Sequence, residues 1–111
     1  MQKISPCLWF DNNAEEAMNF YTCIFKDSKI NRIDRYPEGY SEGPLAGMGG
    51  KVINGEFELN GQSFICLDGG PLFKFSEAIS MSIDCEDQAE VDYFWEKLTS
   101  DGGQESQCGW C

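Results

Sequence analysis

The chain has 111 residues, enough for one domain, and its 41% hydrophobic and 14% aromatic shares are typical of a protein that folds around a core. Its 19 acidic and 8 basic residues give a net charge of −11, which disfavours nucleic acid or an anionic membrane as a partner. The sequence contains no histidine, so Ser-His-Asp and Cys-His catalysis and all histidine-containing metal sites are excluded.

The sequence has neither a basic-then-apolar leader nor a long apolar run, so we expect a cytoplasmic protein without a signal peptide or membrane span. In that reducing compartment the six cysteines are expected to be free thiols. Most of them lie within apolar patterns, where cysteine acts as a small hydrophobic residue.

The first part of the chain predicts a strand, a helix and a second strand. The run "ISPCLWF" (4–10) indicates a strand, and apolar residues recur at helical spacing over 14–25. Asn13 followed by Glu16 has the pattern of a capped helix start. An edge-like strand is expected over 28–36, before a loop rich in glycine and proline.

A hairpin over 51–68 is the best local signal in the sequence. Asn60-Gly61 stands between two runs rich in strand-forming residues, which predicts a two-residue turn. That turn pairs Phe57 with Phe64 and places both, with Cys66, on one face of the sheet.

The second part predicts another strand over 78–84 and another helix. Asp87 followed by Glu90 indicates a capped start for this helix, which is expected to stop at Gly102-Gly103. The apolar residues expected to face inward are Val91, Phe94, Trp95 and Leu98.

An internal repeat relates the two parts. A shift of 74 residues lays Trp9 on Ile83, Asn13 on Asp87 and Tyr21 on Trp95, with strand, cap and helix in the same order. The same shift places a second hairpin beyond the last residue. We therefore expect one domain over 1–111, with module one at 1–70 and an incomplete module two at 71–111 that lacks its last two strands. Either the chain is shortened or another subunit completes the sheet.

A strand-helix-three-strand unit used twice resembles the vicinal oxygen chelate superfamily of glyoxalase I, bleomycin-resistance proteins and ring-cleaving dioxygenases. The sequence is most similar to its PhnB-like branch, often labelled 3-demethylubiquinone-9 3-methyltransferase domain. The stretches that carry the resemblance are "LWFDNNAEEAMNFY", "FELNGQSFICLDGGPLFKF", "AISMSIDCEDQAEVDYFWEKL" and "CGW". The resemblance implies an α+β fold of paired βαβββ modules.

In metal-dependent relatives, four His and Glu ligands lie on the first, fourth, fifth and eighth strands. The resemblance carries three of these positions to Pro6, Cys66 and Ala78, and the fourth to an absent strand. Proline and alanine cannot bind a metal and one cysteine is not a site, so we expect no metal centre.

The same positions imply which face of the sheet lines a cavity. If Cys66 faces the cavity, alternation places Trp9, Ile65 and Leu67 on the opposite face, against the helices. The candidate pocket residues are Pro6, Leu8, Phe10, Phe57, Phe64, Cys66, Asp68, Ser80 and Ser82. Such walls suit a small apolar or aromatic ligand, although the same alternation would also arise if these residues only filled the interior.

Two classes of function stay open. The first is a metal-free protein that binds a small apolar or cationic molecule, as bleomycin-resistance relatives do. The second is an enzyme of the same superfamily with an unknown reaction. Methyl transfer from S-adenosylmethionine is disfavoured because the chain is too short for a doubly wound fold and its glycine cluster leads into a strand, so we expect no cofactor.

Several polar groups have a structural interpretation beside a chemical one. Cys66 is a possible nucleophile, but an apolar surround would raise its pKa and make it a core thiol. Asp68 is a possible general base if it is buried, and a solvated strand-end carboxylate otherwise. The closing "CGWC" (108–111) is a possible redox pair or half of a zinc site, yet it follows a helix rather than opening one, which favours a packing segment. Unpaired strand edges predict a homodimer.

Overall fold

The computed structural model describes residues 2–39, 47–100, 103–106, 109 and 111. Two compact units divide the chain, the first over residues 1–76 and the second over residues 77–111. No helix among the described residues is long and apolar enough to cross a membrane.

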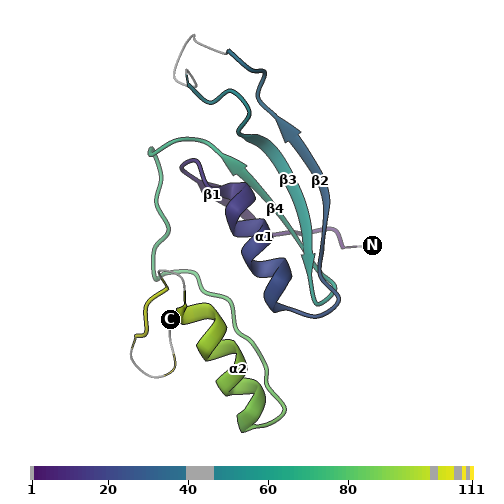
Figure 1. Ribbon diagram of the computed structural model, residues 1–111, viewed down its shortest axis with the longest axis vertical. Coiled ribbons are helices and arrows are strands. Elements are labelled where there is room, and N and C mark those ends of the chain that lie inside the picture. The colour runs from purple at the N-terminus through teal and green to yellow at the C-terminus, as the bar shows by residue number, and fades with distance from the viewer. Residues whose placement is uncertain (1, 40–46, 101–102, 107–108, 110) are drawn as a thin grey trace. The chain divides into compact units, whose positions relative to one another are not determined.

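The first unit is a four-stranded sheet with one helix, and its strands follow the order β1-β4-β3-β2 (Figure 1). β1 is parallel to β4, whereas β4-β3 and β3-β2 are antiparallel. This mixed architecture confirms the predicted α+β class. The elements are β1 (Cys7–Phe10), α1 (Ala14–Ile24), β2 (Lys29–Arg35), β3 (Val52–Leu59) and β4 (Gln62–Asp68).

The predicted hairpin is confirmed, including its register. Leu59 pairs with Gln62, Phe57 with Phe64 and Gly55 with Cys66. Asn60 and Gly61 both have positive φ angles, +51° and +82°, which is the backbone geometry of a two-residue turn whose twist matches that of the strands.

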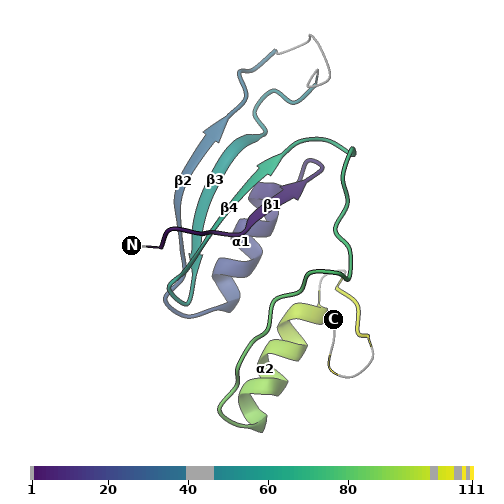
Figure 2. The same cartoon turned by 180° about the vertical axis from the view of Figure 1, so that it is seen from behind.

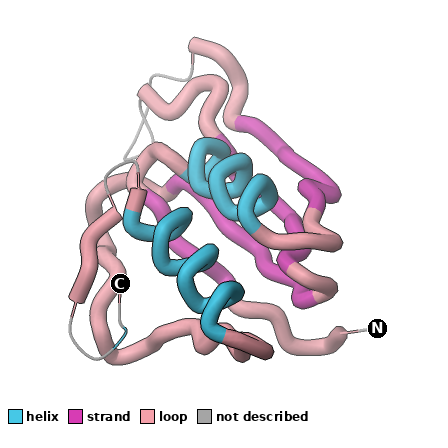
Figure 3. Tube along the Cα trace, turned by 60° about the horizontal axis from the view of Figure 1, so that its bottom comes forward, coloured by secondary structure: helices cyan, strands magenta, loops and turns pink. Residues whose placement is uncertain are grey.

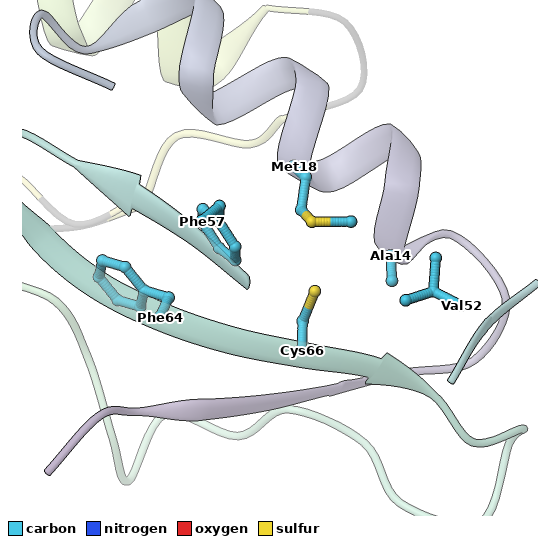
Figure 4. Close-up of a cluster of buried hydrophobic side chains, with 6 residues drawn as sticks. All are labelled: Ala14, Met18, Val52, Phe57, Phe64 and Cys66. Carbon is cyan, nitrogen blue, oxygen red and sulfur yellow. The ribbon is translucent and has the colours of Figure 1, made fainter. Parts of the chain in front are cut away.

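Helix α1 covers one face of the sheet, where the core of the unit lies (Figure 3). Ala14 and Met18 point from the helix toward buried side chains of β3 and β4 (Figure 4). Close approach is possible because Gly55 has no side chain: a Cβ atom there would lie 2.9 Å from the Cε of Met18. The buried cluster consists of Ala14, Met18, Val52, Phe57, Phe64 and Cys66.

The start of α1 differs from the sequence prediction. Asn13 stands at the N-cap position, but its side chain makes no capping hydrogen bond. The amide of Ala14 instead donates to Oδ1 of Asp68 at 2.8 Å. The cap therefore comes from the end of β4, a contact across the sequence that a local capping pattern cannot reveal.

The second unit contains helix α2 (Gln88–Thr99), which begins as predicted: Asp87 accepts a hydrogen bond from the amide of Glu90 at 2.9 Å. No residue of α2 is fully buried: of the four apolar residues expected to face inward, Phe94, Trp95 and Leu98 are half-buried, and Val91 is 44% exposed. The predicted stop at Gly102 lies outside the described residues, and the helix ends at Thr99.

The strand predicted over 78–84 is not observed: the chain forms no strand between Asp68 and the start of α2. A strand needs a neighbour for its backbone N–H and C=O groups, and this segment has none in the sheet. Residues 103–106 form no strand, and Cys108 and Trp110 of the "CGWC" segment lie outside the described residues.

Candidate functional site

The sheet of the first unit presents two different faces, and the predicted assignment of these faces is wrong. Phe57, Phe64 and Cys66 were expected to face a cavity, but they pack beneath α1. Leu8 and Phe10 of β1 pack against the same cluster. Alternation along each strand therefore turns Trp9, Ile65 and Leu67 toward the face without the helix.

The remaining predicted pocket residues lie in different places. Pro6 is half-buried just before β1, and its carbonyl accepts the amide of Ile65 at 2.9 Å. Ser80 and Ser82 are exposed in the second unit, on a segment that forms no strand. The structure thus brings six of the nine candidates into one unit beneath α1: Leu8, Phe10, Phe57, Phe64, Cys66 and Asp68.

Cys66 has the chemistry of a core thiol. Its side chain is 1% exposed beneath Met18 and Gly55. Burial, together with the nearby Asp68 carboxylate, raises the pKa of the Cys66 thiol to about 11. The sequence prediction of a raised pKa is confirmed, and the thiol is poorly suited to act as a nucleophile at neutral pH.

Asp68 is buried and fully engaged. One carboxylate oxygen accepts the amide of Ala14 at 2.8 Å and the other accepts the amide of Val52 at 2.9 Å. The backbone carbonyl of Asp68 accepts the hydroxyl of Tyr36 at 3.1 Å. With both carboxylate oxygens holding backbone amides, Asp68 fastens α1 and β3 to the end of β4.

The open face of the sheet, defined here as the face away from α1, combines an apolar strip with carboxylates. Figure 2 shows this side of the first unit, where β1 crosses in front and α1 lies behind. The apolar strip consists of Trp9, Ile65 and Leu67, which are half-buried. Glu56 lies directly opposite Ile65, and Glu58 lies opposite Ser63, on the same face.

Trp9 is fixed in place at one end of this face. Its indole N–H donates to the carbonyl of Gly70 at 2.9 Å, and the ring of Phe73 meets it edge-on at 4.9 Å between centroids. The ring lies so close to Gly69 that a Cβ atom there would clash with it. These contacts hold the indole ring of Trp9 in one position on β1.

A small hollow of about 250 Å³ adjoins the open face. Phe57 and Phe64, two of the predicted pocket residues, line it together with open-face residues. Its full lining is Gln2, Ser5, Asn31, Glu56, Phe57, Ser63, Phe64 and Ile65.

A larger hollow of about 560 Å³ lies near the start of α1, where most of the lining residues are of polar types. Its lining includes Glu15, but this carboxylate is already engaged by Arg35 through contacts of 2.7 and 2.9 Å. The hydrogen bond from Arg35 lowers the pKa of Glu15. Asp68 also lines this hollow, with both carboxylate oxygens occupied by backbone amides. These two acids are therefore engaged within the protein, and Glu16 and Lys51 complete the charged part of the lining.

Within the described part of the chain, no group of three or more cysteine, aspartate or glutamate side chains is arranged to hold a metal ion. Sequence reasoning missed Trp9 and Glu56 as site residues. Within β1, β3 and β4, alternation separated the two sets of side chains correctly, and the assignment of each set to a face was inverted. Ser80 and Ser82 lie on a segment that forms no strand.

Comparisons with known proteins agree with this fold. The profile of the 3-demethylubiquinone-9 3-methyltransferase family matches residues 2–111. A PhnB protein from Bacillus cereus is 45% identical, with a TM-score of 0.78 over 90% of this chain and 75% of that one. A protein from Staphylococcus aureus is 31% identical, with a TM-score of 0.50 over 89% of this chain and 68% of that one.

A third structure, from Pseudomonas aeruginosa, is 21% identical and shares the fold, with a TM-score of 0.66 over 89% of this chain and 73% of that one. No curated protein matches the chain significantly. Fold and sequence together define a PhnB-like protein of the glyoxalase superfamily. The chain belongs to the 3-demethylubiquinone-9 3-methyltransferase family.

Proposed function

We propose that this protein binds a small apolar or cationic molecule, without a metal ion, on the open face of the sheet in its first unit. The observation that carries the proposal is the juxtaposition of a fixed aromatic ring and aliphatic side chains with carboxylates. Ile65 offers apolar area directly opposite the negative charge of Glu56, and Trp9 adds an aromatic ring at one end of the same face.

The proposed binding activity differs from the methyl transfer that the family's name suggests. Methyl transfer from S-adenosylmethionine would call for a glycine-rich turn that opens a helix. Here the glycines at 47, 49 and 50 lead into β3 at Val52. We therefore propose binding without this cofactor.

A thermal-shift screen tests the proposal. We expect cationic aromatic drugs or quinones to raise the melting temperature, whereas S-adenosylmethionine leaves it unchanged. Ile65→Gln should weaken the shift because it removes apolar contact from the open face, and Val91→Gln on α2 is the matched control. Stabilisation by S-adenosylmethionine alone, or by no compound of either class, would contradict the proposal.

We also propose that the protein forms a homodimer. Support comes from the segment over 77–84, where Ile79 is 80% exposed, Met81 52% and Ile83 37%. These alternating apolar side chains have the pattern of a strand, but no strand pairs with them among the described residues. A second copy would supply one.

A further inference from the structure

We infer that Glu56 is the residue that recognises the positive charge of the ligand, and that the ligand is a small molecule with an ammonium group joined to an apolar body. This inference rests on the proposed function, because it assigns a ligand class to the open face of the sheet.

Glu56 is the carboxylate on the open face that has no partner. Among the described residues it makes no hydrogen bond and no ion pair. Its neighbours are engaged elsewhere: Asn31 donates to Glu58 at 3.3 Å, and Arg32 pairs with Asp34 at 2.9 Å. Arg32 is the residue opposite Glu56 in the ladder, so the cation nearest in register is already paired with another acid.

Half-burial makes the unpaired charge of Glu56 significant. Glu56 lies on β3, an inner strand of the sheet, with β2 on one side and β4 on the other. Ile65 lies directly across the ladder, which places its apolar side chain next to that of Glu56 on the same face. A carboxylate with an apolar neighbour attracts an incoming cation more strongly than a fully solvated one does.

The hollow beside Glu56 has room for a small amine. Its volume of about 250 Å³ is lined by apolar Ile65 and by the Ser63 hydroxyl, which has no partner among the described residues. Gln2 closes one side, held by two hydrogen bonds with the backbone of Ser63, both of 3.1 Å. An ammonium group placed on Glu56 could also donate to the Ser63 oxygen, while its apolar part contacts Ile65.

The test compares 2-phenylethylamine with its neutral analogue 2-phenylethanol, by calorimetric titration at pH 7. We expect the wild-type protein to bind the amine about three- to tenfold more tightly than the alcohol, and added salt to reduce this preference. Glu56→Gln should bind both compounds equally, with the affinity for the alcohol unchanged. Glu16→Gln, which removes the same charge from α1 on the other side of the sheet, should keep the preference. Circular dichroism checks that both variants are folded.

The outcomes separate this inference from the proposed function. If the wild-type protein binds both compounds equally, or if Glu56→Gln keeps the preference, the role of Glu56 is wrong while binding on the open face stands. If neither compound binds, both the inference and the proposed function are overturned.

Discussion

Asp68 is the side chain on which three elements of the first unit converge, since its carboxylate holds the amides of Ala14 and Val52 from the end of β4. Asp68→Asn keeps the size but replaces one acceptor oxygen with an NH₂ group that faces an N–H donor. We expect a loss of about 2–3 kcal/mol in the free energy of unfolding, measured by urea denaturation.

Asp34→Asn is the control for this change, because Asp34 is 41% exposed and pairs only with Arg32. Its effect should stay below about 0.5 kcal/mol. Equal losses for the two variants would show that Asp68 is not a structural clamp.

Cys66 leads to a prediction about reactivity. Burial raises the pKa of its thiol from 9.0 to about 11, so the folded state favours the protonated form. The contribution of this thiol to the free energy of unfolding is therefore fully present below about pH 9. It is lost as the pH rises toward about 11, because the unfolded state then releases the proton more readily than the folded state does. At pH 8 we expect iodoacetamide to label the exposed Cys7 and Cys23 first, with Cys66 labelled only after unfolding. Peptide mass analysis checks the order, and early labelling of Cys66 would contradict it.

Among the strands and helices, the sequence predicts local geometry better than it predicts which face of the sheet a helix covers. The turn at Asn60-Gly61 and its register follow from residues next to each other, and both predictions are confirmed. Alternation also separates Cys66 from Ile65 correctly. It cannot tell which set lies under a helix, because that depends on contacts with Met18, 48 residues away in sequence. The cap from Asp68 was missed for the same reason.

Gly55 tests how closely α1 packs on the sheet. A Cβ atom at this position would lie 2.8 Å from the Sγ of Cys66 and 2.9 Å from the Cε of Met18. Gly55→Ala should therefore overpack the core and lower the free energy of unfolding by about 1–3 kcal/mol. Ser63→Ala, on the open face of the neighbouring strand, should change it by less than about 0.5 kcal/mol in the same urea titration. An unchanged stability in Gly55→Ala would show that α1 shifts freely over the sheet.

At the scale of the whole molecule, two properties of the chain oppose each other. The net charge of −11 repels a second copy, whereas the exposed apolar side chains over 72–83 favour association. Because salt screens the charges and leaves the apolar contact in place, any self-association should strengthen as the salt concentration rises. The sequence predicts the strand over 78–84 from its alternation, but the described residues provide no neighbouring strand with which it could pair.

The homodimer proposal is tested on this segment by light scattering coupled to size exclusion. We expect the wild-type protein to be a dimer at micromolar concentration, more so in high salt. Met81→Asp should shift it to monomer, because it places a charge within the exposed apolar row of Ile79, Met81 and Ile83. Ser80→Asp adds the same charge at a neighbouring exposed position that alternation turns to the other side, so this variant should remain a dimer. A wild-type protein that is monomeric in both low and high salt would overturn the proposal. Equal dissociation of both variants would trace the effect to net charge and not to the apolar row.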